Sequence, residues 1–500
     1  MTESSLKPMP TMQQIQSLCK RRGIVSLGSD IYGGFGNTYS YGPYGSQMKK
    51  NIKDLWWKNF VENRSDIMGI DGDIFLHPKA WEASGHVAGF NDQLVDCKDC
   101  KARIRADHLV EDALSIDCEG KSDEEVTQII QDNNLTCPKC KSKNLTNARK
   151  FNLMFKTELS KTEKSGKSGG NGKQEDANFV YLRPETAQAI FLEFKNVVDT
   201  SRARIPFGLA QIGKAFRNEI TPGNFIFRQL EFEQMEIEYF FSPPKNWVHN
   251  KADLMSKGHI DDWDAESRDH VNAQFDKWSK DIYNWCDIVG LDSEKCHAIE
   301  HAPEKLSHYS KRTFDIEFDF PFGQKELYGC AYRTDFDLTQ HQEFSGKKLE
   351  YRDPQTNEVY TPHVLEPTFG LGRTFLAILT SAYEEETLED GSSRTVLHLK
   401  PSIAPVKVAV LPLMKKDGLP EISREILKSL QSFGACEYDE GGQIGKRYRR
   451  QDEIGTPVCI TVDYDTKEDD SVTVRDRDTM KQERVKISEL KEYLFERYFG

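Results

Sequence analysis

Residues 213–241, GKAFRNEITPGNFIFRQLEFEQMEIEYFF, decide the fold of this chain. Two aromatic-rich runs flank a Thr-Pro-Gly-Asn segment at 221–224, which predicts an antiparallel hairpin with its turn there. Because side chains alternate between the two faces of a strand, residues of one parity on each strand share a face. Cations, acids and an aromatic ring should therefore converge on one side of the sheet: Arg217, Glu219, Arg228, Phe232, Glu236 and Glu238.

This expected face has two interpretations. The first is a ladder of surface salt bridges. The second is a nucleotide site, because guanidinium groups bind phosphates bidentately and an aromatic ring can cover a purine.

Strand-like runs continue on both sides of the hairpin. Aromatic and β-branched residues are frequent at 179–185, 205–213, 225–241, 314–320 and 327–338, which predicts strands. Apolar residues three and four apart predict helices at 49–61 and 374–385. We therefore expect an α+β domain, in which helices flank an antiparallel sheet, over residues 1–400.

A second domain is expected at 401–500. Strand-like and amphipathic runs alternate there at 406–413, 421–434, 456–464 and 471–477, which predicts an α/β arrangement. Within the first domain, composition predicts a small cysteine-containing insert at 97–140, a flexible loop at 160–177 and a helical insertion at 247–306.

The cysteine insert predicts a metal site. Cys97 and Cys100 form one C-x-x-C pair, and Cys137 and Cys140 form another. Each pair can place two thiolates on one side of a tight turn, and four thiolates complete a tetrahedral zinc site. Cys118 lies between the pairs and could compete as a ligand. The alternative is that the four thiols bind nothing.

Net charge and hydropathy exclude some classes of function. The net charge of -13 argues against a protein that coats nucleic acid with a broad basic surface. A local basic patch, KRYRR at 446–450, is either a nucleic-acid contact or a solvated helix face. No apolar run is long enough to span a bilayer, and the first residues do not resemble a signal or transit peptide. We expect a cytoplasmic protein with no membrane role.

Two segments together resemble the class II aminoacyl-tRNA synthetases. FRNE at 216–219, a short loop and then R-x-x-x-F at 228–232 resemble motif 2 of that family. EPTFGLGR at 366–373, followed by an apolar helical pattern, resembles motif 3. The resemblance implies an antiparallel catalytic sheet flanked by helices, a zinc-ribbon-like insert, a helical insertion and a C-terminal anticodon-binding domain.

Other segments resemble the homodimeric glycyl-tRNA synthetases. YGPYG at 41–45 is similar to their motif 1 region, which lies at the dimer interface, and LRPETAQ at 182–188 and WEASGHVAGFND at 81–92 are similar to their signature segments. The likeness covers nearly the whole chain. It implies an enzyme that activates glycine with ATP and transfers it to tRNA(Gly), with Mg²⁺, as a homodimer.

The resemblance implies roles for individual residues in ATP binding. Arg217 would bridge the α-phosphate and the attacking carboxylate and, with Arg373, act in catalysis. Arg228 and Arg373 would hold the outer phosphates, Phe232 would stack on adenine, and Glu326 would lie near Mg²⁺. The full implied ATP set is Arg217, Asn218, Glu219, Phe227, Arg228, Gln229, Leu230, Glu231, Phe232, Glu326, Leu327, Gly370, Leu371, Gly372 and Arg373.

A glycine pocket must bind an ammonium group and exclude larger side chains, and carboxylates suit the first task. Thr368 stands where the family has serine, so a hydroxyl is kept and tighter crowding is expected. The implied set is Arg105, Glu185, Phe232, Glu233, Gln234, Met235, Glu236, Glu366, Pro367, Thr368, Phe369 and Gly370. In the second domain, 446–450 and the RDRD segment at 475–478 would contact the anticodon.

Three other readings stay open. A non-catalytic relative would be expected to lack the phosphate-binding arginines, which are present here. A zinc-ribbon binding protein leaves motifs 2 and 3 unexplained. Another class II enzyme, for serine, threonine, proline or histidine, is the nearest enzymatic alternative, and the acid-rich pocket argues against it.

Overall fold

The computed structural model describes residues 8–118, 120–159, 179–220, 223–245, 247, 259–388 and 390–500. The flexible loop expected at 160–177 lies outside these residues, as does the 248–258 part of the expected helical insertion. Among the described residues, no helix combines the length and the apolar character needed to cross a bilayer.

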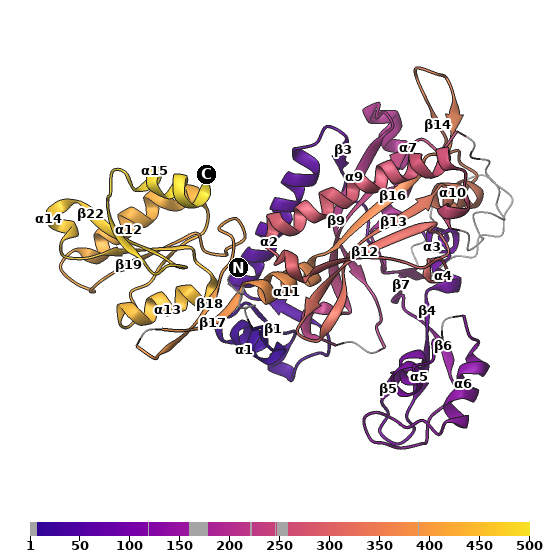
Figure 1. Ribbon diagram of the computed structural model, residues 1–500, viewed down its shortest axis with the longest axis horizontal. Helices are drawn as coiled ribbons and strands as arrows, with labels where there is room; N and C mark the ends of the chain where they lie inside the picture. The colour runs from indigo at the N-terminus through magenta and orange to yellow at the C-terminus, as the bar shows by residue number, and fades with distance from the viewer. Residues whose placement is uncertain are drawn as a thin grey trace, which may run out of the picture.

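A seven-stranded sheet forms the centre of the larger part of the molecule (Figure 1). Its strand order is β11-β12-β13-β16-β10-β9-β3, and all neighbours are antiparallel except β9 and β3. The predicted antiparallel sheet is confirmed. The strands are β3 Ile67–Gly69, β9 Phe207–Phe216, β10 Glu231–Phe241, β11 Cys296–Glu300, β12 Arg312–Phe320, β13 Gly323–Thr334 and β16 His363–Gly370.

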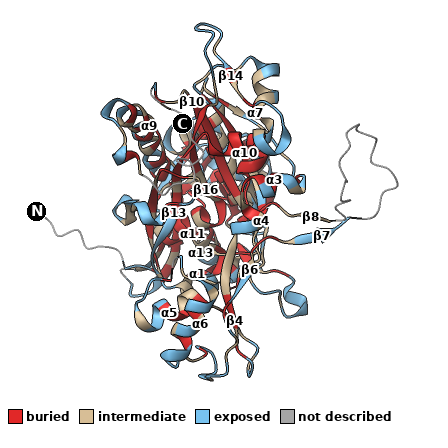
Figure 2. Ribbon diagram, turned by 90° about the vertical axis from the view of Figure 1, so that its right-hand side faces the viewer, coloured by how far each residue is buried: buried red, intermediate tan, exposed pale blue. Residues whose placement is uncertain are grey.

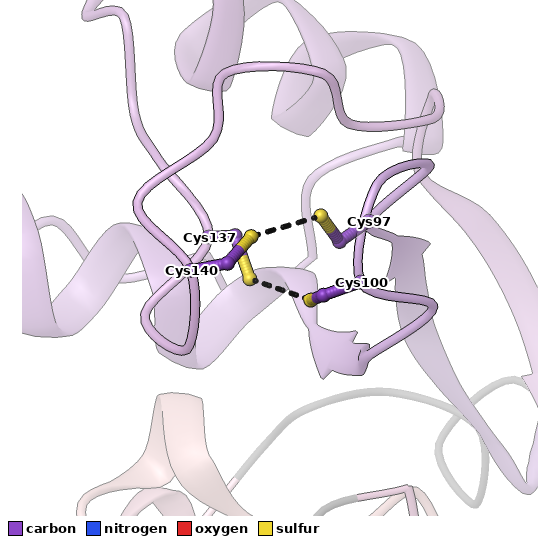
Figure 3. Close-up of side chains that lie close together, drawn as sticks. All are labelled: Cys97, Cys100, Cys137 and Cys140. Carbon is purple, nitrogen blue, oxygen red and sulfur yellow. Dashed lines mark hydrogen bonds between the residues drawn. The ribbon is translucent and has the colours of Figure 1, made fainter.

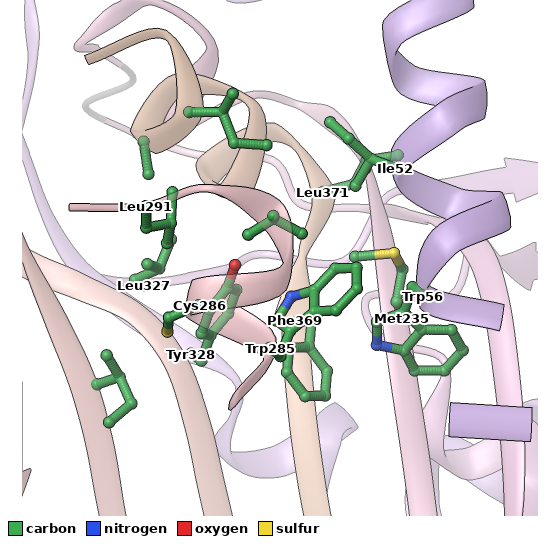
Figure 4. Close-up of a cluster of buried hydrophobic side chains, with 14 of the residues drawn as sticks. Ile52, Trp56, Met235, Trp285, Cys286, Leu291, Leu327, Tyr328, Phe369 and Leu371 are labelled. Atoms are coloured by element: carbon green, nitrogen blue, oxygen red, sulfur yellow. The ribbon is translucent and has the colours of Figure 1, made fainter. Parts of the chain in front are cut away.

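One face of this sheet is an apolar core (Figure 4). Odd-numbered residues of β10, such as Met235, pack there with Phe369 of β16 and with Trp56 and Trp285 from the covering helices. All four side chains are fully buried, and each contributes roughly 1.5–3 kcal/mol through burial alone. The covering helices are α2 Pro43–Trp57, α9 Ala265–Val289 and α11 Leu371–Ala382.

The opposite face is divided in two. Helices α7 Ala187–Ser201 and α10 Phe336–Ser345 cover one part with a second apolar cluster that includes Phe194, Phe240 and Leu338. The remainder carries the even-numbered, polar residues of β10 and is left open. Figure 2 shows the buried central strands between these helical layers.

Smaller elements surround the core. A three-stranded sheet, β5-β4-β6, carries the cysteine insert at one end of the molecule (Figure 1). The further bounds are α1 Met12–Arg22, β1 Val25–Leu27, β2 Tyr39–Tyr41, α3 Pro78–Ala83, α4 His86–Gly89, β4 Asn91–Asp96, β5 Arg103–Arg105, α5 Ala106–Leu114, α6 Asp123–Asp132, β6 Arg149–Asn152, β7 Lys156–Glu158, β8 Phe179–Tyr181, β14 Tyr351–Arg352, β15 Val359–Tyr360, β17 Tyr383–Thr387 and β18 Ser393–Leu397.

The C-terminal part has its own five-stranded sheet, with order β20-β19-β21-β22-β23. The parallel pairs β19/β20 and β19/β21 give it the α/β character that the sequence predicts. Its elements are β19 Val408–Pro412, α12 Leu419–Leu430, β20 Cys436–Tyr438, α13 Ile444–Ile454, β21 Val458–Val462, α14 Thr466–Asp469, β22 Ser471–Asp476, β23 Gln482–Lys486 and α15 Leu490–Leu494.

Several expected boundaries are wrong. Strand β9 ends at Phe216 and β10 begins at Glu231, so the connection is longer than a 221–224 turn and contains a 3₁₀ helix at Phe225–Phe227. Residues 336–338 begin α10 instead of extending β13. Residues 383–385, expected at the end of the 374–385 helix, belong to strand β17 (Tyr383–Thr387) instead, because they pair with β18. Residues 296–300 of the expected helical insertion are strand β11 at the edge of the central sheet.

Candidate active site

A cavity of about 460 Å³ lies on the open polar face of the central sheet. Its walls come from β10, β13, β16, the β9–β10 connection and the cysteine insert. Of the residues implied for ATP and glycine, those that line it are Arg105, Glu185, Arg217, Glu219, Phe227, Arg228, Gln229, Phe232, Glu233, Gln234, Glu236, Glu326, Leu327, Glu366, Thr368, Gly370, Gly372 and Arg373.

Seven implied residues do not line this cavity. Met235 and Phe369 have odd strand parity, so both side chains lie in the apolar core on the other face. Glu231 is directed to solvent and pairs with Lys214. The others are Asn218, Leu230, Pro367 and Leu371, of which Leu371 also belongs to the apolar core.

One end of the cavity is acidic. Glu236 of β10 lies opposite Thr368 of β16 in the strand register, and Thr368 Oγ1 donates to Glu236 Oε1 at 3.0 Å. Thr186 donates to the other oxygen of Glu236. Glu185, just before α7, and Glu366 of β16 complete a group of three buried carboxylates at this end.

A buried arginine next to these acids was not predicted from the sequence. Arg333 is 1% exposed, and its Nη1 donates to Glu366 Oε1 at 2.8 Å. Its Nε and Nη2 donate to Asp337 at 2.7 and 2.9 Å. The guanidinium lies 3.8 Å from the ring centroid of Tyr309. Because all these contacts are buried, the arginine fixes the position of Glu366.

Opposing effects set the ionisation of the acids. Burial alone would raise the pKa of Glu185, but His86 at 3.3 Å and Arg333 outweigh it, so that pKa lies below its usual value. Burial raises the pKa of Glu366, and the charge of Arg333 opposes that rise. For Glu236, burial and the charge of Glu185 raise the pKa. The pocket therefore lacks the positive charge that would balance all of its carboxylates.

The other end of the cavity is cationic. Arg217 lies between the rings of Phe90 and Phe232, 5.3 Å from each centroid, and its Nε donates to Pro184 O at 3.0 Å. Arg228 Nε lies 4.0 Å from Glu219. These groups come from the irregular chain between β9 and β10, so the strand parity expected for Arg217 and Glu219 is wrong, although both side chains still reach the cavity.

Arg373 lies in the first turn of α11 and completes the cationic end of the cavity. Its Nη1 donates to the backbone oxygen of Glu326 at 3.1 Å and lies 3.0 Å from the Glu326 carboxylate. Gly372 beside it packs tightly, because an added Cβ would lie 2.8 Å from the backbone oxygen of Ile226. A strand that passes through glycines into a helix therefore places this arginine over the cavity.

The cysteine insert supplies part of the cavity wall. Arg105 ends β5, and its guanidinium lies 3.1 Å from Asp92 of β4 and 2.5 Å from Asp107. Arg105 and Asp92 both line the cavity. Asp92 was not expected there, nor were Phe90, His301, Tyr309 and Asp315. Phe90 and Asp92 lie in the 81–92 segment that the sequence analysis singled out, although no role was assigned to them there. His301, Tyr309 and Asp315 come from segments without a recognisable motif, so only the folded arrangement reveals them.

The four expected cysteines converge (Figure 3). Cys97 Sγ lies 3.6 Å from Cys140 Sγ, and Cys100 Sγ lies 3.6 Å from Cys137 Sγ. All four sulfurs are within 4.8 Å of one another. Zinc–sulfur bonds of ~2.3 Å in a tetrahedron place sulfurs ~3.8 Å apart, so the cluster fits zinc.

The two cysteine turns have the same backbone form. Lys101 N donates to Cys97 O and Lys141 N donates to Cys137 O, at 2.9 and 2.8 Å. Both lysines have a positive φ, of 60° and 62°. Cys118, the possible competitor, is outside the group and packs in the apolar core of the insert.

The C-terminal arginines differ from expectation. Arg447 is 2% exposed and donates to the backbone oxygens of Pro412, Leu413 and Asp439. Arg475 is 3% exposed and binds Asp452 through two hydrogen bonds of 2.8 and 3.1 Å.

Arg477 is also buried and donates to the backbone oxygens of Leu399 and Gly455. These three guanidinium groups therefore hold the domain together and are not available to RNA as placed. Lys446 remains exposed.

Two families match parts of the chain. The family described as "tRNA synthetase class II core domain (G, H, P, S and T)" matches residues 171–382. The family described as "Anticodon binding domain" matches residues 407–497.

Similar proteins extend over nearly the whole chain. A "Glycine--tRNA ligase" of Clostridium acetobutylicum is 49% identical over 498 residues, which cover 98% of this chain and 100% of the relative. Proteins of the same name from Geobacillus thermodenitrificans and Clostridium beijerinckii are 49% and 50% identical, and the matches cover 97% of this chain and 97% and 98% of the relatives. This chain therefore belongs to the glycine–tRNA ligase family of class II tRNA synthetases.

Proposed function

We propose that this chain activates glycine with ATP and transfers it to tRNA(Gly). The observation that carries the proposal is the polarity of the cavity. One end gathers the carboxylates of Glu185, Glu236 and Glu366, and the other presents the guanidinium groups of Arg217, Arg228 and Arg373. An amino acid bound by its ammonium at the acidic end would direct its carboxylate toward phosphates held at the cationic end.

The first step joins these two substrates. A glycine carboxylate oxygen attacks the α-phosphorus of ATP, the bond to the β-phosphate oxygen breaks, and pyrophosphate leaves. Arg217 neutralises the charge that grows on the α-phosphoryl oxygens, while Arg228 and Arg373 hold the outer phosphates. No protein nucleophile is required, because positioned cations supply the stabilisation.

Adenine would stack against Phe232, and Glu219 would accept from its amino group. Glu326 offers oxygen ligands for Mg²⁺, which neutralises phosphate charge when it is bound. In the second step a ribose hydroxyl of the tRNA attacks the carbonyl carbon of glycyl-adenylate, and AMP leaves.

Selection of glycine rests on charge and space. Glu185 and Glu236 would accept from the ammonium, and Glu366, fixed by Arg333, would provide a third acceptor. Because Thr368 and Glu236 are bonded to each other across the strand pair, an added methyl group would displace a hydrogen-bonded wall. Exclusion by such contact is stronger than the ~1–3 kcal/mol that a methylene gains in a roomy pocket.

Further assignments follow from the family. Cys97, Cys100, Cys137 and Cys140 would bind structural zinc, since their thiolates fit a closed tetrahedral site. Residues 1–400 and 401–500 would be the catalytic and anticodon-binding domains. The protein would act in the cytoplasm as a homodimer through the 41–45 region.

The test is ATP–pyrophosphate exchange with purified protein, supplied in turn with glycine, alanine and serine. Exchange with glycine alone is expected, followed by glycylation of tRNA(Gly). Arg217→Ala should abolish exchange while the thermal unfolding curve stays unchanged.

Each of the other outcomes would contradict a different part of the proposal. Exchange with serine or alanine would move the chain to another class II specificity. Absence of exchange with every amino acid would favour a non-catalytic relative. Exchange by Arg217→Ala at the wild-type rate would refute the role given to that arginine.

A further inference from the structure

Glu238 is a fully buried acid that the mechanism does not use. It follows Glu236 on the same face of β10, and its exposed fraction is 0%. Among the described residues, neither of its carboxyl oxygens has a hydrogen-bond partner. Burying an unpaired carboxylate has a large free-energy cost, so we expect Glu238 either to hold a proton or to bind a cation.

Among the described residues, the groups around Glu238 are mostly acids, and Arg333 is the cation that faces it. One carboxylate oxygen from each of Glu236, Glu238 and Glu366 lies within 4.8 Å of the other two. The neighbouring residue across β9 is Leu209, which is apolar. The titratable or charged groups that face Glu238 are Glu236 of β10, Glu366 of β16, Arg333 and Cys330 of β13, and Asp337 of α10.

Arg333 offsets the charge of Glu238 only in part and forms no hydrogen bond with it. Its hydrogen bonds to carboxylates go to Asp337 and Glu366. When two carboxyl groups lie this close, they cannot both be charged at little cost, and one holds a proton. Arg333 donates to Glu366, whereas neither oxygen of Glu238 has a partner among the described residues, so of these two acids Glu238 holds the proton more firmly.

We propose that Glu238 is kept as the neutral acid and is a positioning residue for the glycine pocket, whose O–H donates to the Glu366 oxygen that Arg333 does not bind. The part that concerns glycine rests on the proposed function, and the part that concerns the proton does not. A carboxylate oxygen accepts more than one hydrogen bond, so Glu366 can still accept from an ammonium.

The electrostatic surroundings support this arrangement. Burial, reinforced by the charge of Glu366, raises the pKa of Glu238 well above its usual value. With Glu238 neutral, Arg333 balances part of the charge of the remaining carboxylates, and a single ammonium can balance more of it. An ionised Glu238 would instead repel Glu366 out of its position.

The first experiment measures the proton without any substrate. The folded-to-unfolded ratio of wild type and Glu238→Gln is determined by urea unfolding from pH 5 to pH 8. A proton held only in the folded state makes wild-type stability fall as the pH rises above the unfolded Glu pKa of ~4.3. Relative to Glu238→Gln, the wild-type ratio should fall by up to tenfold per pH unit.

The control is Glu317→Gln, a change at an exposed carboxyl of β12 that accepts from Gln324. Its curve should run parallel to that of wild type. Parallel curves for wild type and Glu238→Gln would overturn the proposal, because they would show that Glu238 is ionised in the folded protein.

The second experiment tests positioning. Glu238→Met removes the donor at similar length and should raise the glycine KM at least tenfold, with the ATP KM and kcat changed less than twofold. Glu238→Gln keeps a donor and should recover most of the lost affinity. Equal glycine KM values for the two variants would overturn the positioning role. If Glu238→Met does not fold, the pH dependence of Glu238→Gln still decides the protonation state.

A third measurement excludes a cation in place of the proton. Urea unfolding of the wild type is measured at pH 8 with and without Ca²⁺ or Mg²⁺, in the absence of ATP. Stabilisation that is lost in Glu238→Gln would show that a cation occupies the cluster, and it would overturn the proposal. Failure of glycine-dependent exchange in wild type would refute the proposed function and leave the unfolding result unaffected.

Discussion

Replacement of Arg333 by methionine is the most informative perturbation of the site. Methionine keeps much of the side-chain length but removes a buried cation with three hydrogen bonds to carboxylates, at 2.7, 2.8 and 2.9 Å. Asp337 and Glu366 would be left buried without their counter-ion. Removing one partner of such a network costs about 3–5 kcal/mol.

The expected shift in Tm follows from the size of the unfolding unit. Unfolding entropy is ~2.1 cal/mol/K per residue, or ~0.8 kcal/mol/K for about 400 residues. A loss of 3–5 kcal/mol therefore lowers Tm by about 4–6 °C. Differential scanning calorimetry measures this shift, and pyrophosphate exchange should show an increased glycine KM in the same variant.

Arg312→Met is the matched control. Arg312 also forms two hydrogen bonds to one carboxylate, that of Glu300, at 2.7 and 3.1 Å. The side chains are 22% and 46% exposed, so the pair is worth at most about 1 kcal/mol and the Tm should fall by about 1 °C. Equal shifts for the two variants would refute the argument that burial makes Arg333 important.

Three further changes test other parts of the structure. Cys137→Ser should abolish binding of one zinc ion per chain, measured by metal analysis after dialysis, whereas Cys118→Ser should retain it; equal zinc contents would refute the ligand set. Gly372→Ala should raise the ATP KM at least tenfold, because its Cβ would meet a backbone oxygen at 2.8 Å, and an unchanged ATP KM would contradict that packing. Arg475→Met should destabilise the C-terminal sheet by about 1.5–3 kcal/mol in urea unfolding, since buried Asp452 loses two hydrogen bonds but keeps its ion pairs with Arg394 and Arg449. Glycine-dependent pyrophosphate exchange should persist in that variant, and its loss would show that the C-terminal part is needed for activation.

The sequence predicted features that depend on local pattern. Strand alternation identified the face that carries Phe232 and Glu236, and cysteine spacing identified four thiols that do converge. The C-terminal strand and helix alternation is also confirmed. These predictions succeeded for the same reason. The alternation of side chains along a strand and the short C-x-x-C spacing are set by local backbone geometry and do not depend on distant contacts.

Features that depend on distant contacts could not be predicted. Arg333 lies where the register of β13 against β16 is irregular, so strand parity did not reveal that it meets Glu366. The basic residues at 446–450 do not form one continuous basic surface, because Arg447 is buried against backbone oxygens while Lys446 is exposed. Composition cannot distinguish a guanidinium that binds its own chain from one that is free.

The three-stranded sheet of the cysteine insert links the state of its thiols to the activity of the enzyme. Strand β4 carries Asp92 into the cavity wall, and the first cysteine follows its end at position 97. Arg105, on the neighbouring strand, salt-bridges to Asp92. Oxidation of the four cysteine thiols would therefore disturb the active-site cavity, because it would release strands β4 and β5, which carry Asp92 and Arg105 of the cavity wall. Oxidants that react only with these cysteines, and not with the substrates, would thus lower the activity of the synthetase.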